Sequence, residues 1–149
     1  RVLNLMESGI NKLFITRPIR IDEINMSNLD LDNIEFMGMV SGLSELNMTG
    51  SKVHNLMPLL ELVDLYKLNL SSCRMTTKML DNYLIGIVKD YRNRRNCNVT
   101  IRNTVKPSGE YKRPDVLSLP QTGMEAIWVL TNEREPEELW RFDLGETTY

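Results

Sequence analysis

Polar residues recur every 22 residues in this chain, each time inside a segment that reads apolar-x-x-apolar-Asn-apolar. Their side chains carry amides, hydroxyls and charges, which bind partners through hydrogen bonds and ion pairs. With the matching positions of a fourth segment near residue 100, the candidate binding residues are Glu23, Asn25, Glu45, Asn47, Thr49, Lys67, Asn69, Ser71, Thr100 and Arg102. The alternative is that the stacked Asn, Ser and Thr side chains only hydrogen-bond one another across neighbouring strands.

Acid–base catalysis has one candidate, His54, which is the only histidine in the chain. It falls in a polar turn after the second repeat, without a Ser or Cys motif around it and without a carboxylate that the sequence assigns to it. An exposed structural residue is the favoured interpretation, and an enzyme without a linear motif is the alternative. The chain also lacks a Gly-rich phosphate loop and the G-x-S-x-G and H-E-x-x-H segments. We therefore expect no catalytic residue and no cofactor.

Metal binding is not expected either. One histidine and two cysteines, Cys73 and Cys97, cannot complete a Cys₂His₂ or His₃ zinc site. Asp30 and Asp32 could give oxygen ligands to a cation, but their segment lacks the glycine of a calcium-binding loop. Two cysteines are too few for a disulfide framework, so two buried thiols are favoured over a single bridge.

The charge of the chain argues against specific nucleic-acid binding, because the formal net charge is -2. One basic cluster, formed by Lys89, Arg92, Arg94 and Arg95, ends a predicted helix, where cations complement the helix dipole. Phosphate or an acidic partner is the alternative role for this cluster. Tyr91 is the only aromatic residue among them, whereas binding of single-stranded nucleic acid needs several aromatic side chains on which bases stack. No apolar run approaches the ~20 residues of a membrane span.

Four parallel strands are predicted from alternating polar and apolar residues at 23–27, 45–49, 67–71 and 98–102. A repeat period in the twenties is typical of a solenoid, in which one strand per turn stacks on the next. Short apolar segments between strands should return the chain to the sheet, and Pro58 suits the first turn of a short helix there. The longest predicted helix covers 76–93 and begins at Thr76-Thr77.

Both ends of the chain are less regular. Residues 1–22, with a predicted strand at 12–16, are interpreted as an N-terminal cap or the end of a preceding repeat. Residues 23–106 form the predicted solenoid, and 107–149 a Pro-containing linker followed by two strands at 125–131 and 139–144. These strands predict a β-hairpin whose Trp128, Trp140 and Phe142 pack on the solenoid or contact a partner within an assembly. Because the chain begins with Arg1, we expect its natural start to have been removed.

The segments Leu43-x-x-Leu46-x-Met48 and Leu65-x-x-Leu68-x-Leu70 resemble the leucine-rich repeat family. The variant looks closest to the BspA-like repeats of bacterial surface and phage proteins, on the Asn-Met-Ser-Asn stretch at 25–28 and the Met-rich run at 34–39. The tail at 107–111 and 122–130 resembles the endings of tailed-phage structural proteins. The third repeat departs from the pattern, because it is about ten residues too long.

This resemblance implies an α/β fold, a short leucine-rich-repeat solenoid with a parallel sheet and, here, a C-terminal β-hairpin. It implies recognition through the strand face and no chemistry. The expected function is a non-enzymatic structural or binding module of a larger assembly, namely a capsid or tail component of a phage virion. The alternative is a bacterial cell-surface adhesion domain that binds a protein or a glycan. The expected location is the virion or the extracellular surface.

Overall fold

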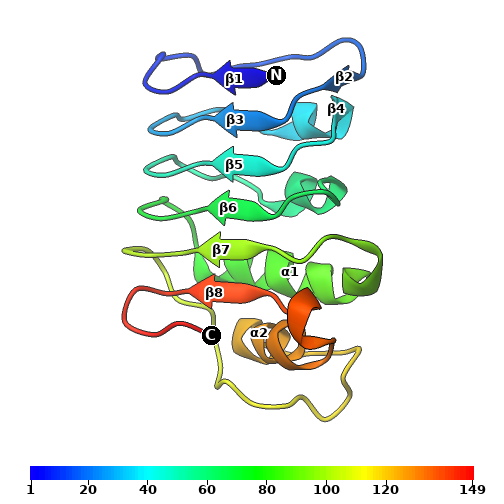
Figure 1. Ribbon diagram of the computed structural model, residues 1–149. Helices are drawn as coiled ribbons and strands as arrows, with labels where there is room; N and C mark the ends of the chain where they lie inside the picture. The colour runs from blue at the N-terminus through cyan, green and yellow to red at the C-terminus, as the bar shows by residue number, and fades with distance from the viewer.

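Six short parallel strands stack edge to edge and form one sheet in the computed structural model, which describes residues 1–149 (Figure 1). The fold is α/β, because helices pack on one side of this sheet. In order across the sheet, the strands are β1 (Val2–Asn4), β3 (Glu23–Asn25), β5 (Glu45–Asn47), β6 (Lys67–Asn69), β7 (Asn98–Thr100) and β8 (Arg141–Asp143). Two further strands, β2 (Ile19–Arg20) and β4 (Val40–Ser41), pair in parallel beside it.

The register of the sheet follows the 22-residue period of the sequence. Glu23 pairs with Glu45, and Glu45 with Lys67, so equivalent positions lie side by side. Main-chain bonds extend this ladder beyond the strands, since the N–H of Met26 donates to the carbonyl of Asn47 at 2.9 Å. The four strands predicted from the alternation are confirmed, each shorter than predicted.

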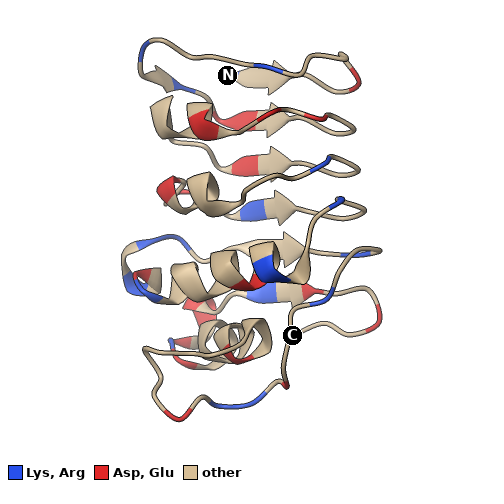
Figure 2. Ribbon diagram, turned by 180° about the vertical axis from the view of Figure 1, so that it is seen from behind, with Lys and Arg blue, Asp and Glu red and all other residues tan.

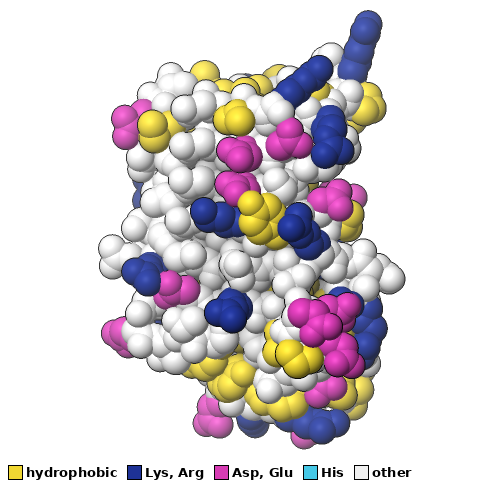
Figure 3. All heavy atoms as spheres, viewed as in Figure 1, with side chains coloured by type: hydrophobic (Ala, Val, Ile, Leu, Met, Phe, Trp, Pro, Cys, Tyr) yellow, Lys and Arg dark blue, Asp and Glu magenta, His cyan; other side chains and the backbone are white.

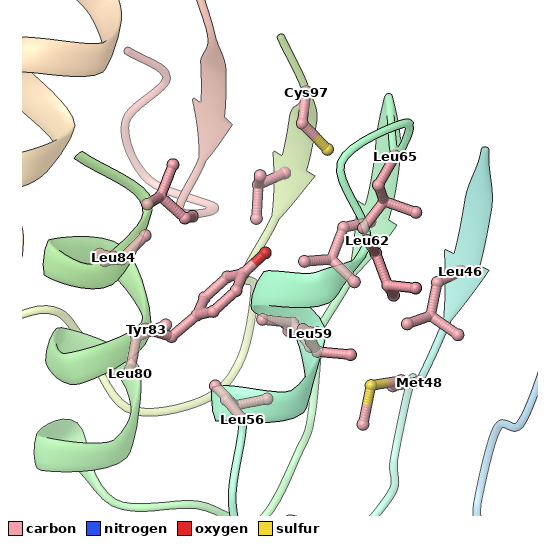
Figure 4. Packing of buried hydrophobic residues seen from close by; sticks show 14 of the residues in the cluster. Leu46, Met48, Leu56, Leu59, Leu62, Leu65, Leu80, Tyr83, Leu84 and Cys97 are labelled. Carbon is pink, nitrogen blue, oxygen red and sulfur yellow. The ribbon is translucent and has the colours of Figure 1, made fainter. Parts of the chain in front are cut away.

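The core lies between the sheet and the helices. Ile24, Leu46 and Leu68 occupy equivalent strand positions and are at most 2% exposed. Figure 4 shows how Tyr83 reaches from the helical layer across toward Leu62 and Cys97. The alternation therefore has a simple cause: one side of each strand is removed from water, and the other faces it.

Helical segments return the chain to the sheet on the side seen in Figure 2. They are η1 (Glu35–Met39), η2 (Met57–Glu61), α1 (Thr77–Val88), η3 (Tyr91–Asn93), α2 (Gly123–Asn132) and η4 (Pro136–Glu138). The predicted long helix is confirmed as α1 followed by η3, and the Thr76 side chain caps it by accepting from the N–H of Met79. Pro58 lies in the first turn of η2, as predicted.

The N-terminal strand is in a different place from the one predicted. Residues 12–16 form no strand, and β1 at Val2–Asn4 pairs with β3 instead. Leu3 pairs with Ile24, and Asn4 with Asn25, so residues 2–5 repeat the pattern of the next strand. Leu13 and Ile15 of the 12–16 segment also pack against the core, but this segment pairs with no strand and leaves the apolar Phe14 exposed between them.

The predicted C-terminal β-hairpin is wrong. Residues 123–132 form α2, and Arg141–Asp143 forms β8, which pairs with β7 in parallel as the sixth strand. Thr122 caps α2, because its side chain accepts from the N–H of Glu125. Beyond β8 the chain folds back, and the main chains of Phe142 and Tyr149 hydrogen-bond each other in both directions.

Cys73 and Cys97 are both free and buried. Burial raises the pKa of the Cys73 thiol to about 11 and that of Cys97 to about 12, because the apolar surroundings disfavour the thiolate. None of the helices is long and apolar enough to cross a membrane.

Candidate interaction surface

The solvent-facing residues of the six strands form one continuous surface, which we call the strand face (Figure 3). Parallel register arranges them in columns that run across the sheet. The first column, from the β1 edge to the β8 edge, is Val2, Glu23, Glu45, Lys67, Asn98 and Arg141. The second is Asn4, Asn25, Asn47, Asn69, Thr100 and Asp143. The predicted binding residues are therefore brought together.

The asparagine column has a structural task of its own. The Oδ1 atom of Asn47 accepts from the N–H of Thr49 at 2.9 Å and from its hydroxyl at 2.6 Å. The Oδ1 atom of Asn25 likewise accepts from the N–H and the hydroxyl of Ser27, and that of Asn69 accepts from the N–H of Ser71. Each asparagine thus stabilises the turn that follows its own strand, rather than bonding across strands as the alternative interpretation supposed.

The backbone that follows each of these turns is left-handed. The residue three positions after Asn25 and Asn69 has a positive φ, 58° at Asn28 and 55° at Ser72. At the equivalent position after Asn47 the chain has Gly50, which adopts φ 75° without steric cost. The Nδ2 groups of Asn47 and Asn69 donate no hydrogen bond within the chain, so they remain free to bind a carbonyl or hydroxyl oxygen.

The charges of the first column are not paired with one another. Glu23, Glu45 and Lys67 belong to no ion pair, although eight ion pairs form elsewhere in the chain. Glu23 and Glu45 are directly opposite each other on neighbouring strands, and like charges in that arrangement repel. Figure 3 shows acidic side chains over the upper strands with Lys and Arg side chains below them, and further acidic side chains in the lower half of the view. Within the first column, therefore, one pole is acidic and the other is basic.

Tyr66 stands between these poles. Its hydroxyl donates to Oε1 of Glu45, and the Arg95 guanidinium lies 4.3 Å from its ring centre. The hydrogen bond to the Glu45 carboxylate raises the pKa of Tyr66, since ionisation of the phenol would break it. One oxygen of Glu45 is thus held in place by the protein, and the carboxylate is oriented before any partner arrives.

A shallow hollow of about 290 Å³ lies on the strand face. It is lined by seven residues of the two columns, and by Ile24 and Leu46 between them; the seven are Val2, Glu23, Asn25, Glu45, Asn47, Lys67 and Asn69. Six of these are among the predicted binding residues. A concave site lined by charged groups and by amide donors without a partner is suited to holding an extended segment of another molecule.

The other predicted residues of this surface are engaged within the protein. Arg102 donates to Asp143 at 2.6 Å, and this contact lowers the pKa of the Asp143 carboxyl. The Ser71 hydroxyl accepts from the N–H of Arg102 at 3.1 Å. The Thr49 hydroxyl is bound to Asn47. The available part of the surface is therefore centred on β3, β5 and β6.

The predicted assembly contacts are corrected in part. Trp140 and Phe142 are 3% and 0% exposed and pack against each other with ring centres 6.0 Å apart. They cannot touch a partner while the core is intact, because their side chains are buried in the core beside β8, the last strand of the parallel sheet, and not on one arm of a hairpin. Trp128 is half-buried on α2 and packs against the core.

His54 has a carboxylate partner that the sequence alone did not assign. Its Nε2 lies 3.0 Å from Oδ1 of Asp30, and this hydrogen bond lowers the pKa of the Asp30 carboxyl. The signal was present, since a period of 22 brings position 54 next to the Asp30/Asp32 pair. No group of three or more His, Cys, Asp or Glu side chains is arranged to hold a metal ion.

The basic cluster at the end of α1 is divided between separate contacts. Arg94 is buried and donates to Asp90 and to the carbonyl of Leu60. Arg92 lies over the ring of Tyr91, and Arg95 over that of Tyr66. The cluster therefore presents no single cationic patch, and Arg94 joins the helical layer to the neighbouring turn.

Comparisons with protein-family models, with curated proteins and with solved structures found no match to this chain.

Proposed function

We propose that this chain is a short leucine-rich-repeat solenoid that acts as a non-enzymatic binding module of a larger assembly, and that its partner is a protein bound on the strand face. The observation that carries this proposal is the hollow on that face, where unpaired charges and free amide donors converge. The family resemblance supports the same surface, since leucine-rich repeats bind through the strand side. The 22-residue spacing of three aligned strands supports the solenoid.

The setting that we propose is a phage virion, in which the chain joins other capsid or tail proteins. A bacterial surface adhesion domain is the second setting, because the BspA-like resemblance includes both classes. In either setting the buried Trp140 and Phe142 leave the strand face, not the C-terminal segment, as the surface that meets the partner.

The test compares two charge-reversed variants. Glu23→Lys/Lys67→Glu changes the strand face at two exposed positions, whereas Glu61→Lys/Lys78→Glu makes the same exchange on η2 and α1. Each protein is cross-linked to intact particles and to cell envelopes from its source, and the cross-linked peptides are identified by mass spectrometry. We expect capture by the wild type and the helical-side variant and loss of capture by the strand-face variant.

Cross-links to capsid or tail proteins assign the virion setting, and cross-links to an envelope protein assign the adhesion setting. Capture that survives the strand-face exchange but fails after the helical-side exchange would overturn the proposal. Unchanged melting temperatures are the control that both variants are folded.

A further inference from the structure

The order of charges along the first column carries information about the partner. From the β1 edge the column reads apolar, negative, negative, positive, neutral, positive, at Val2, Glu23, Glu45, Lys67, Asn98 and Arg141. Within this column charges are separated by sign rather than interspersed, so each half of the column attracts the opposite charge. A uniformly acidic or uniformly basic partner would be attracted by one half and repelled by the other.

The protein does not neutralise these charges itself. Neither Glu23 nor Glu45 forms an ion pair with a Lys, Arg or His side chain of the chain. The two carboxylates repel each other across neighbouring strands. A cation seated between them would relieve that repulsion, and Tyr66 already holds Glu45 in position for it.

The spacing of the strands converts this charge order into a sequence pattern. Neighbouring strands lie ~4.8 Å apart, so the midpoint of Glu23 and Glu45 is roughly 12 Å from the midpoint of Lys67 and Arg141. An extended chain advances about 3.3 Å per residue and alternates its side chains. Side chains four residues apart therefore face the same way at about the required distance.

We infer that the strand face binds an extended protein segment that crosses the strands and carries a Lys or Arg and an Asp or Glu four residues apart. The cation lies between Glu23 and Glu45, and the carboxylate lies near Lys67 and Arg141. The free Nδ2 groups of Asn47 and Asn69 donate to main-chain carbonyls of the segment between them. This inference rests on the proposed function, because it names the chemistry of the partner at the same surface.

The probe is a library of random linear 12-residue peptides, selected for binding to the wild-type chain. Enriched peptides are expected to contain oppositely charged residues four positions apart. For a selected peptide, exchange of its cationic residue for Met is expected to weaken binding to the wild type about fivefold, the upper range for one exposed ion pair. The same exchange should have almost no effect on binding to the variant Glu23→Gln/Glu45→Gln. The difference between the two effects measures the coupling between the cationic residue of the peptide and the two glutamates.

The matched control is Glu61→Gln/Lys78→Gln on the helical side, which should retain the full wild-type response to the peptide exchange. Chemical shifts of the β3, β5 and β6 amides report whether a peptide occupies the strand face. Peptides that perturb these amides but show no coupling to Glu23 and Glu45 overturn this inference and leave the proposed function intact. Failure to enrich any peptide that perturbs the strand face overturns both.

Discussion

The chain returns to its sheet through two kinds of connection, which divide the molecule into a regular and an elaborated region. In the regular region, residues 21–70, equivalent strand positions such as Glu23, Glu45 and Lys67 are 22 residues apart, and the connections contain only the short helices η1 and η2. In the elaborated region, residues 71–149, the spacing grows to 31 residues from Lys67 to Asn98 and to 43 from Asn98 to Arg141. These connections contain α1 and α2.

Strand register is the same in both regions despite this difference in length. Leu68 pairs with Val99, and Val99 with Phe142, just as Leu46 pairs with Leu68. The position of a strand is therefore fixed by its alternating pattern and its neighbour, and not by the length of the connection before it. Longer connections are tolerated because closing a longer loop adds only a slowly growing entropy cost.

The elaborated region gains apolar burial from its longer connections. Helix α1 buries five side chains, Leu80, Tyr83, Leu84, Ile87 and Val88, whereas η2 buries only Leu59. The last strands therefore have a thick helical layer behind them. The first strand does not, since its core-facing Leu3 is only partly buried and Phe14, in the connection that follows, is 76% exposed. We expect the two regions to differ in local stability while sharing one core.

The most severe test of the shared core replaces one fully buried side chain in each region. We expect Phe142→Ala to lower the free energy of unfolding by about 3–5 kcal/mol and Leu46→Ala by about 2–5 kcal/mol. Both tryptophans lie in the elaborated region, so their fluorescence during urea unfolding reports on that region. If Leu46→Ala leaves the tryptophan transition where it is in the wild type, the regions unfold independently. The exposed Val116→Ala should have little effect and is the control.

Thiol labelling can resolve whether the boundary between the two regions opens before the interior of the elaborated region. Both cysteines follow residue 70, but the Cys73 thiol donates to the carbonyl of Met48 in the regular region, whereas Cys97 directly precedes β7. With pKa values raised to about 11 and 12 from 9.0, the thiolate fractions at pH 8 fall by roughly 10²- and 10³-fold. We expect labelling by a thiol reagent to be negligible until denaturant is added, with mass spectrometry showing which cysteine reacts first.

Rapid labelling of both cysteines in the native protein would contradict this burial. If the intact mass of the protein is the same before and after treatment with a reducing agent, both thiols are free.

The asparagine turns offer a smaller test, at a single strand. Asn47→Ala removes two hydrogen bonds to Thr49 and leaves its N–H without that partner, which should cost about 2 kcal/mol. Asn98→Ala, at an exposed strand position whose side chain makes no hydrogen bond, should cost less than about 0.5 kcal/mol. Thermal unfolding of the wild type and of both variants measures the two losses of stability. Similar losses for both would mean that the asparagines do not stabilise the turns.

The smallest expected effect concerns the ion pair between Arg102 and Asp143. It lies in the elaborated region and joins the turn after β7 to the last residue of β8. Arg102 lowers the pKa of Asp143 below its ordinary 3.8, so the folded state binds this proton less readily than the unfolded state. The stabilisation is therefore complete above the unfolded pKa and is lost as the pH falls through the lowered folded value. Melting temperatures of the wild type and Asp143→Asn should differ slightly at pH 7 and converge well below pH 3.8. A constant difference down to pH 2 would argue against the ion pair as the cause.

Sequence reasoning succeeded where the pattern is repeated and failed where it occurs once. The inner strands were predictable, since Ile24, Leu46 and Leu68 recur at equal spacing. Helix α2 was assigned to a strand because the run from Ala126 to Leu130 is apolar on every side, and such a run has no period to distinguish helix from strand. The missed signal was Thr122 with Glu125 three residues later, which resembles a capping box.

The strand face was predictable from the same repetition, because parallel register follows once the strands are known. The hydrogen bonds and ion pairs that each of these side chains makes within the protein could not be predicted from the sequence. Asn25, Asn47 and Asn69 were predicted to bind a partner, yet half of each amide stabilises its own turn. Arg102 was predicted to be available, but Asp143, 41 residues later, binds it. Contacts of this kind depend on residues that no periodicity connects.

The fold-back of residues 147–149 onto β8 has a consequence for self-assembly. A sheet edge with unpaired main-chain groups is a template on which further strands can add, and repeated addition leads to fibres. Here the N–H and carbonyl of Phe142 are already bonded to Tyr149, in the antiparallel direction that the rest of the ladder does not use. The last rung is thereby closed to another parallel strand, so growth of the sheet by stacking copies end on end is blocked at this edge.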